Sequence, residues 1–176
     1  MDKISDCILV ERTLSGNRNA FEEIVRRHQD NVYALAMRLV RDRETARDVA
    51  QDTFVRAYTR LSTFHMDGSL RNWLLTICVN QGKNRLRSRS RRRQVFGTYA
   101  SGTPQALQAE GPDRMIVEEA LARIPDKLLL PLTLRHLHGL TYEEVAGVLG
   151  IGVSAAKMRT KRARDRLVEI MEGSSK

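Results

Sequence analysis

The sequence predicts an all-α protein of two small helical domains joined by a flexible linker, with a helix-turn-helix in the C-terminal domain. Along most of the 176 residues, apolar side chains recur at steps of three and four, as on one face of a helix. Residues 94–112 break that pattern and are rich in Gly, Ser, Thr, Ala and Pro, which is typical of a linker. The two domains are therefore expected at 1–93 and 113–176, each long enough for a modest core.

Two helices are predicted early in the N-terminal domain. The apolar period of the first includes Phe21, Ile24, Val25, His28, Val32, Leu35, Ala36 and Leu39, and that of the second includes Ala46, Val49, Ala50, Phe54, Ala57, Tyr58 and Leu61. Asp48, Gln51 and Asp52 fall outside the second stripe and form an acidic and amide patch on a basic protein. Taken alone, such a patch is most often ordinary solvated surface.

A short loop separates these helices from a third, which is predicted from about 69 to 87. The loop combines an aromatic residue, a flexible glycine and small polar groups in the order Phe64, His65, Met66, Asp67, Gly68 and Ser69. It could hold a base extruded from a DNA duplex, and the alternative is an ordinary helix connection.

The third helix has an apolar side and a cationic C-terminal half. Trp73, Leu74, Ile77 and Cys78 make the apolar side, and the polar residues that follow include Asn80, Lys83, Asn84, Arg85 and Arg87. The basic run continues to Arg93 and predicts phosphate as the counter-charge. A disordered basic tail is the alternative, disfavoured because the run continues a helix with an apolar face of its own.

In the C-terminal domain, Pro131 lies within 126–135, where it is expected to kink a helix or to mark its first turn. Thr141 and Glu144 then have the spacing of a capping box at the start of a helix. Gly150 can take the positive φ that a sharp turn needs, and a second helix is predicted from Ser154. Two helices joined at a glycine indicate a helix-turn-helix.

The second of these helices has a small-residue stripe and a cationic surface. The stripe consists of Ala156, Thr160, Ala163, Leu167 and Ile170, and the basic residues outside it are Lys157, Arg159, Lys161, Arg162, Arg164 and Arg166. A solvated basic helix is the alternative interpretation. The capped helix and glycine turn in front of it favour insertion into a DNA groove instead.

Composition narrows the class of protein. A net charge of +9 favours a polyanionic partner. Cys7 and Cys78 form no Cys-x-x-Cys pair, the N-terminus lacks a signal-peptide pattern, and the longest apolar run, 128–134, is too short to span a bilayer. The four histidines lack partners at ligand spacing, and no P-loop or Gly-x-Ser-x-Gly motif occurs. We therefore expect a soluble cytoplasmic protein without metal, cofactor or catalytic activity of its own.

Three motifs in order resemble those of bacterial sigma factors of the extracytoplasmic-function (ECF) type, within the sigma-70 family. They are DVAQDTFVRAY at 48–58, WLLTICVN at 73–80 with Asn84 and Arg85 beyond it, and GLTYEEVA at 139–146 running into Arg162-Ala-Arg164. The resemblance covers most of the chain and implies a promoter-melting domain, a linker and a helix-turn-helix domain. Gly152, residues 154–156 and Met158 depart from the family pattern, so the resemblance does not extend to the upstream DNA preference.

The resemblance also implies roles for individual residues. Docking on core RNA polymerase would fall to Asp48, Gln51 and Asp52, and capture of a flipped minus-ten base to Phe64, His65, Met66, Asp67, Gly68, Ser69 and Asn80. The DNA backbone beside that base would be bound by Lys83, Asn84, Arg85 and Arg87, and the minus-thirty-five element by Lys157, Met158, Arg159, Lys161 and Arg162. Among the last group, Arg162 and Lys161 are expected at base edges, and Lys157 and Arg159 at phosphates.

The family resemblance also implies that an anti-sigma factor controls the chain. One rival interpretation is a stand-alone helix-turn-helix regulator whose N-terminal domain senses a ligand or dimerises. The basic run from Lys83 to Arg93 argues against it, since a sensor domain has little use for a second phosphate-binding surface. A nucleic-acid-modifying enzyme would need clustered carboxylates or metal ligands, and the sequence shows none.

Overall fold

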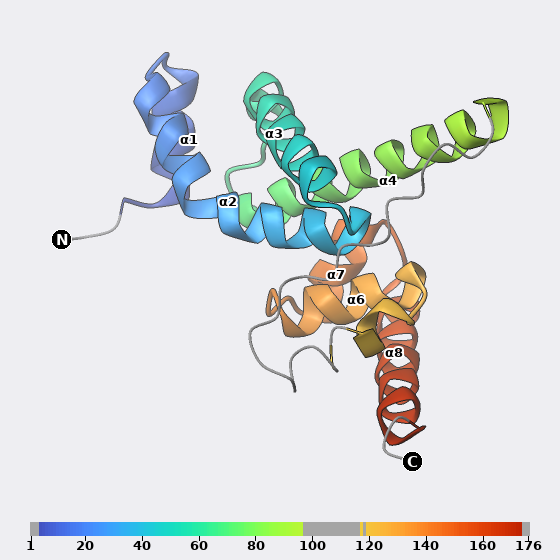
Figure 1. Cartoon of the computed structure of the whole chain (residues 1–176). Coiled ribbons are helices and arrows are strands. Elements are labelled where there is room, and N and C mark those ends of the chain that lie inside the picture. Colours follow the sequence, from blue (N-terminus) through green and yellow to red (C-terminus); the bar gives the residue numbers. More distant parts are fainter. Residues whose placement is uncertain (1–3, 97–116, 118, 174–176) are drawn as a thin grey trace. The chain divides into compact units, whose positions relative to one another are not determined.

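The computed structural model describes residues 4–96, 117 and 119–173. The chain divides into two compact units, Met1–Tyr99 and Ala100–Lys176. All regular structure in the described residues is helical (Figure 1), and the all-α prediction is confirmed. Residues 97–112, the larger part of the predicted linker, lie outside the described residues. None of the described helices is long and apolar enough to cross a membrane.

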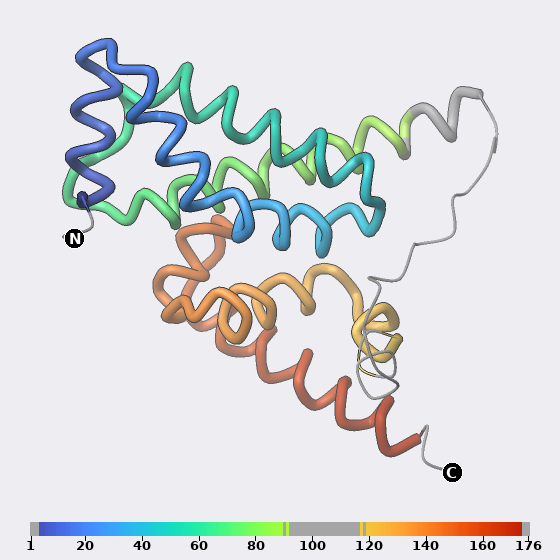
Figure 2. Tube along the Cα trace, turned by 60° about the vertical axis from the view of Figure 1, so that its left-hand side comes forward, coloured from blue at the N-terminus to red at the C-terminus, as the bar shows by residue number. Residues whose placement is uncertain are grey.

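The first unit is built around one long helix. Its described elements are α1 (Asp6–Leu14), α2 (Arg18–Val40), α3 (Arg43–Thr59), the 3-10 turn η1 (Leu61–Thr63) and α4 (Leu70–Phe96). Helices α1, α3 and α4 all pack against α2 (Figures 1 and 2). Ser5, Asn17 and Asp42 cap α1, α2 and α3, each accepting a hydrogen bond from the backbone N–H three residues further on.

The core of the first unit follows the predicted apolar stripes, with one exception. Ile24, Leu35, Leu74 and Cys78 are almost completely buried, whereas Tyr58 is 47 % exposed. The Tyr58 ring lies at the edge of the core, where it packs edge-on against Phe21 with 4.9 Å between ring centroids.

Two features of this unit were not predicted. Helix α1 was missed, because its nine residues are too few to establish an apolar period. The role of Gly82 was also missed: a Cβ there would lie 2.8 Å from Leu39 Cδ1, so only a glycine lets α4 approach α2 this closely without a shift.

Helix α4 is longer than the sequence predicted. It continues past Arg87 to Phe96, so residues 94–96 are helical and the linker cannot begin at residue 94. The basic run from Lys83 to Arg93 therefore lies within a helix, and the interpretation as a disordered tail is wrong for it.

In the second unit, helical residues 119–122 precede α6 (Asp126–His136), α7 (Tyr142–Leu149) and α8 (Val153–Gly173). Ile124, Leu129, Leu132 and Ala163 form a buried cluster. The predicted stripe of α8 is confirmed, since Ala156, Thr160 and Ala163 are buried and Leu167 and Ile170 pack against the cluster. The helix begins one residue before the predicted start.

The turn signals of this unit behave as predicted, apart from Pro131. The Thr141 hydroxyl accepts a hydrogen bond from the Glu144 backbone N–H at 3.2 Å, and the Glu144 carboxylate accepts one from the Thr141 N–H at 2.7 Å. Gly150 ends α7 with a φ of 66°. Pro131 lies inside α6, beyond its first turn, so the first-turn interpretation is wrong. The Pro131 ring removes the N–H that the Lys127 carbonyl would otherwise accept from.

Candidate protein and nucleic-acid interfaces

The predicted acidic and amide patch lies on the outer face of α3. Asp48, Gln51 and Asp52 are all exposed, while Val49 and Thr53 on the opposite side are buried. Val55 follows at helical spacing from Gln51 and Asp52 and is 58 % exposed. The patch is therefore mixed, with an apolar side chain next to polar ones. The sequence signal that would have identified Val55 is an apolar residue that lies outside the predicted apolar stripe of its helix.

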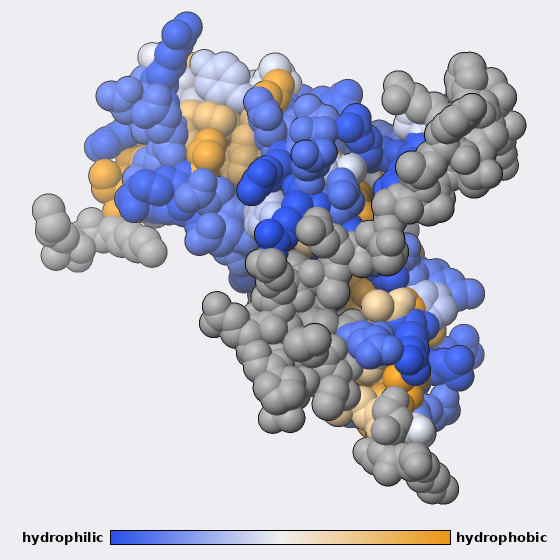
Figure 3. Space-filling view, viewed as in Figure 1, coloured by the Kyte–Doolittle hydropathy of each residue, from blue (hydrophilic) through white to orange (hydrophobic). Residues whose placement is uncertain are grey.

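An apolar area lies between α1 and α3 on an otherwise largely hydrophilic face of the first unit (Figure 3). The exposed apolar side chains of these two helices are Ile8, Leu14, Val55 and Tyr58. Exposed apolar side chains next to polar ones are typical of surfaces that contact another protein.

The predicted base-capture loop is a tight turn anchored at both ends. The Gly68 N–H donates to the His65 carbonyl at 2.9 Å, and the Ser69 hydroxyl accepts from the Asn72 N–H at 3.3 Å. The Cys7 thiol of α1 donates to the Met66 carbonyl at 3.3 Å, which ties the loop to a second helix. Residues 65–69 are exposed.

Phe64 has a different position from the rest of the loop. Its side chain is 7 % exposed and packs edge-on against Trp73, with 5.6 Å between ring centroids. An edge-on ring with so little exposed area offers no face on which a base could stack. Phe64 therefore supports the loop from below, and the exposed groups come from residues 65–69.

Asn80 is exposed on α4, two turns beyond Trp73. Seven residues of helix correspond to about 10 Å along the axis and to nearly the same side of the helix. Trp73 and Asn80 thus line one side of α4, starting at the loop. A nucleic-acid strand leaving the loop along this side would pass Asn80.

The cations of α4 lie on two different sides of the helix, which had not been distinguished from the sequence alone. At 100° per residue, Asn80, Lys83, Asn84 and Arg87 fall on one side of the helix, which we call the open face of α4. Arg85 and Arg89 lie about 140° and about 180° around the helix axis from Asn80, on the side that faces α3, which we call the flank of α4. Of the predicted backbone-binding residues, three are therefore grouped on one side and Arg85 is separate.

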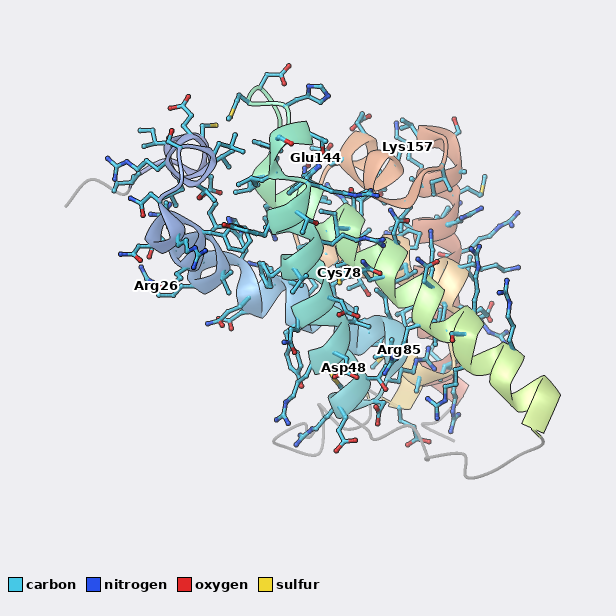
Figure 4. The ribbon with its side chains drawn as sticks, turned by 90° about the horizontal axis from the view of Figure 1, so that it is seen from above. Arg26, Asp48, Cys78, Arg85, Glu144 and Lys157 are labelled. Atoms are coloured by element: carbon cyan, nitrogen blue, oxygen red, sulfur yellow. The ribbon has the colours of Figure 1, made fainter. Side chains whose placement is uncertain are left out.

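The flank of α4 meets α3. Arg85 Nη2 lies 2.9 Å from Asp48 Oδ2 (Figure 4), which joins a predicted DNA contact to a predicted docking residue. Hydrogen bonds from the Thr45 side chain and backbone hold the pKa of Asp42 below its usual value, and the positive charge of Arg89 lowers it further. Both cations of the flank are thus near carboxylates at the N-terminal half of α3.

In the second unit, α8 carries its predicted DNA contacts away from the buried stripe. Lys157, Met158, Lys161 and Arg162 are exposed, whereas Arg159 is half-buried and lies closer to the rest of the unit. The Lys157 ammonium lies 5.8 Å from the ring centroid of Tyr142, and Arg135 Cζ lies 5.2 Å from the same centroid.

Arg135 was not among the predicted site residues. Its guanidinium also donates to the Leu140 carbonyl at 2.8 Å, so it is held beside Tyr142 at the end of α6. Its neighbourhood with Lys157 could not be predicted, because the two residues come together only when α6, α7 and α8 are packed.

A polar hollow of about 440 Å³ lies where α1 meets α2 and α4 in the first unit. It is lined by Ile4, Ser5, Asp6, Arg27, His28, Asn31 and Arg71. Asp6 lies 3.2 Å from Arg27 and 2.9 Å from His28 Nε2, so these groups tie α1 to α2. In the described part of the chain, no three His, Cys, Asp or Glu side chains gather closely enough to hold a metal ion.

Two family models match the chain. The sigma-70 region 2 model matches residues 24–92, and the sigma-70 region 4 model matches residues 114–167. The RNA polymerase sigma-H factor of Pseudomonas aeruginosa is 32 % identical, over 93 % of this chain and 92 % of that protein. The ECF RNA polymerase sigma-E factor of Escherichia coli K12 is also 32 % identical, over 94 % of each chain.

Solved structures of two other proteins are similar to this chain in fold and in sequence over most of its length. The sigma factor RpoE of Bartonella quintana, in complex with the anti-sigma factor NepR, has a TM-score of 0.77 and 27 % identity, over 86 % of this chain and 96 % of that one. CnrH, in complex with the cytosolic domain of CnrY, has a TM-score of 0.72 and 28 % identity, over 96 % of this chain and 97 % of that one.

Proposed function

The chain belongs to the ECF sigma factors of the sigma-70 family, and we propose that its two helical units divide polymerase docking and promoter recognition between them. As an ECF sigma factor, it binds core RNA polymerase and promoter DNA and directs the initiation of transcription. Residues 1–93 dock on the polymerase and open the minus-ten element, residues 113–176 bind the minus-thirty-five element, and the segment between the end of α4 and residue 113 tethers them. The polymerase supplies the catalysis, and the cytoplasm, where polymerase works, is the proposed location.

Docking falls to the outer face of α3. Asp48, Gln51 and Asp52 offer charge and hydrogen bonding, and the neighbouring Val55 offers apolar area that an interface would bury. This combination in a chain of net positive charge supports a protein partner for α3, because DNA would repel the carboxylates.

Strand opening falls to the loop and the open face of α4. Residues 65–69 present the polar groups for an extruded base, with Phe64 holding the loop on Trp73. Asn80 continues the site along the helix, and Lys83, Asn84 and Arg87 contact phosphates beyond it. Arg85, on the flank of the same helix, is assigned to a further phosphate. Unstacking a base costs a few kcal/mol, which hydrogen bonds and contacts in such a site can offset.

Upstream recognition falls to α8. Lys161 and Arg162 are exposed in the third turn of α8, which follows a capped helix and a glycine turn, and they are assigned to base edges. Lys157 and Arg159 are assigned to phosphates, and Met158, 51 % exposed, to apolar contact in the groove.

An anti-sigma factor is the proposed regulator. The support is that RpoE and CnrH, which resemble this chain over most of its length, were solved with NepR and with the cytosolic domain of CnrY. The apolar area between α1 and α3 is exposed in the chain alone and is available to such a partner.

One observation carries this proposal over the rival of a stand-alone regulator: the first unit has both an exposed acidic and apolar helix face and a separate cationic helix. A sensor or dimerisation domain needs neither in combination. The test is co-elution of the purified chain with core RNA polymerase at moderate salt without DNA. Replacing Gln51 and Asp52 by alanine should weaken co-elution while helical content is kept, and Glu22→Ala, an exposed carboxylate on α2, is the matched control. Separate elution of the folded wild-type chain would favour the stand-alone regulator.

A further inference from the structure

The flank of α4 brings together the two surfaces to which the proposed function assigns separate partners. Asp48 belongs to the docking face of α3, and Arg85 belongs to the residues assigned to the DNA backbone. Their side chains meet at 2.9 Å, although 37 residues separate them in the sequence. In the view from above, both point into the space between α3 and α4 (Figure 4).

Neither side chain is locked in place by burial. Arg85 is 52 % exposed and Asp48 is 55 % exposed, so water and partner molecules can reach both. An exposed ion pair of this kind is weak, and either group can exchange its partner for a better one. A phosphate is such a partner for Arg85, and a polar or cationic group of a protein is such a partner for Asp48.

We propose that the Asp48–Arg85 ion pair couples polymerase docking to DNA binding. In the free chain, Asp48 holds Arg85 on the flank of α4 and neutralises it. When α3 docks, Asp48 turns to the polymerase, and Arg85 becomes available to a phosphate on the flank of α4. The inference rests on the proposed roles of α3 and α4, and adds to them a direct link between the two sites.

The coupling works in both directions. Binding free energies are linked, so DNA binding that takes Arg85 away from Asp48 must strengthen polymerase docking. The factor is the same as that by which docking strengthens DNA binding. For an exposed pair this factor is about two- to fivefold. Such a factor disfavours engagement of DNA by the sigma factor alone, and adds to the stability of the complex once all three partners are present.

The test compares single and double variants of the full chain without polymerase. Binding to a labelled single-stranded oligonucleotide at low salt is measured by fluorescence anisotropy for wild type, Asp48→Asn, Arg85→Gln and the double variant. Asp48→Asn should raise affinity about two- to fivefold by releasing Arg85. Removing any negative charge near the site also favours DNA, so Asp52→Asn, one turn further on the same face, is the matched control and should raise affinity less.

In the Arg85→Gln background, Asp48→Asn should give no more gain than Asp52→Asn. Equal gains from Asp48→Asn and Asp52→Asn in the wild-type background would overturn the coupling. A separate measurement with the reconstituted holoenzyme tests the proposed function itself, since Arg85→Gln should weaken its promoter binding there. If Arg85→Gln leaves holoenzyme binding unchanged, Arg85 is no DNA contact, and its proposed role fails along with the coupling. If only the free-chain comparison fails, the proposed function stands.

Discussion

Helices α4 and α8 are both long, both have a buried stripe and both carry a run of cations outside it. They differ in whether a neighbouring helix supplies a carboxylate that pairs with one of these cations. On α8, Lys157, Lys161 and Arg162 are exposed, and the ion pair of Arg166 with Glu169 stays within the helix. On α4, Arg85 is paired with Asp48 of a neighbouring helix. The same residue types therefore make different surfaces, because the element packed beside a cationic helix decides which of its charges can reach phosphate.

This difference suits two kinds of DNA contact. A helix whose cations are mostly exposed and not paired with a neighbouring helix can enter a groove as soon as DNA is present. A helix whose flank is neutralised by a neighbour binds DNA fully only when that neighbour is engaged elsewhere. In the proposed coupling, α8 is ready to bind DNA, whereas Arg85 of α4 depends on the docking of α3.

Each of the two helices is held in its unit by its buried stripe, and a cavity in the stripe of α4 should loosen that hold. Leu75 is completely buried, so Leu75→Ala should lower the free energy of unfolding of the first unit by about 2–5 kcal/mol through lost burial and a cavity. Trp73 is the single tryptophan of the chain and reports on this unit alone, so urea denaturation followed by its fluorescence measures the change. Arg87→Gln, on the exposed side of the same helix, should leave the midpoint nearly unchanged. An unaffected midpoint for Leu75→Ala would mean that α4 does not depend on this packing.

The second prediction sharpens the role of α8. Arg162→Gln should cost about 1–3 kcal/mol in discrimination between a cognate upstream element and one with altered bases, if the guanidinium contacts a base edge. Holoenzyme binding to both fragments is measured at fixed salt. A loss of equal size on both fragments would assign Arg162 to a phosphate, and α8 would then resemble the open face of α4 more closely than proposed.

The third prediction concerns the carboxylates beside α4. Asp42→Ala should lower the free energy of unfolding by about 0.5–2 kcal/mol, because Asp42 caps α3. Since the pKa of Asp42 is lowered in the folded chain, its stabilising effect is present above the usual carboxyl pKa and is lost as pH falls through the lower folded value. Denaturation of wild type and variant between neutral and acidic pH should show the difference shrinking.

Asn17→Ala is the matched control, because Asn17 caps α2 with an uncharged amide. Its cost should not change over the same pH range. A cost of Asp42→Ala that is equally constant would show that the charge of Asp42, and with it the influence of Arg89, is of no consequence.

Many features of this structure could be predicted from local sequence signals, because the residues that form each signal lie within one or two helical turns of one another. Thr141, Glu144 and Gly150 act within a few residues of one another, so the capping box and the turn could be predicted without knowing the fold. The buried stripe of α8 could be predicted for the same reason. The end of α4 could not, since the basic residues near 90 are compatible with helix and with disorder, and Pro131 lies inside a helix against its local preference.

The arrangement of the site residues depends on packing between elements, which could not be predicted from the sequence. The pairing of Asp48 with Arg85 needs a particular register of α3 against α4. Both helices pack on α2, and the close approach of Gly82 to Leu39 helps to fix the position of α4 on it. The burial of Phe64 needs Trp73 to lie under the loop. The sequence could therefore place residues on elements and on the sides of a helix, whereas the fold was required to show which side of α4 is covered by α3.

Lys157 of α8 is oriented by the Tyr142 ring, and a change there should have a small effect on DNA binding. Lys157 and Arg135 both lie over the Tyr142 ring, so Tyr142→Leu should remove the ring that orients both and weaken upstream DNA binding by about 0.5–1 kcal/mol. Tyr142→Phe keeps the ring and should restore most of the affinity, which separates ring stacking from the hydroxyl. Because oriented cations contact phosphate more fully, the slope of affinity against salt should fall for Tyr142→Leu and stay unchanged for Tyr142→Phe. If the leucine variant keeps the wild-type slope, Lys157 needs no neighbour to reach DNA, and the contrast with Arg85, whose availability depends on the helix beside it, becomes sharper.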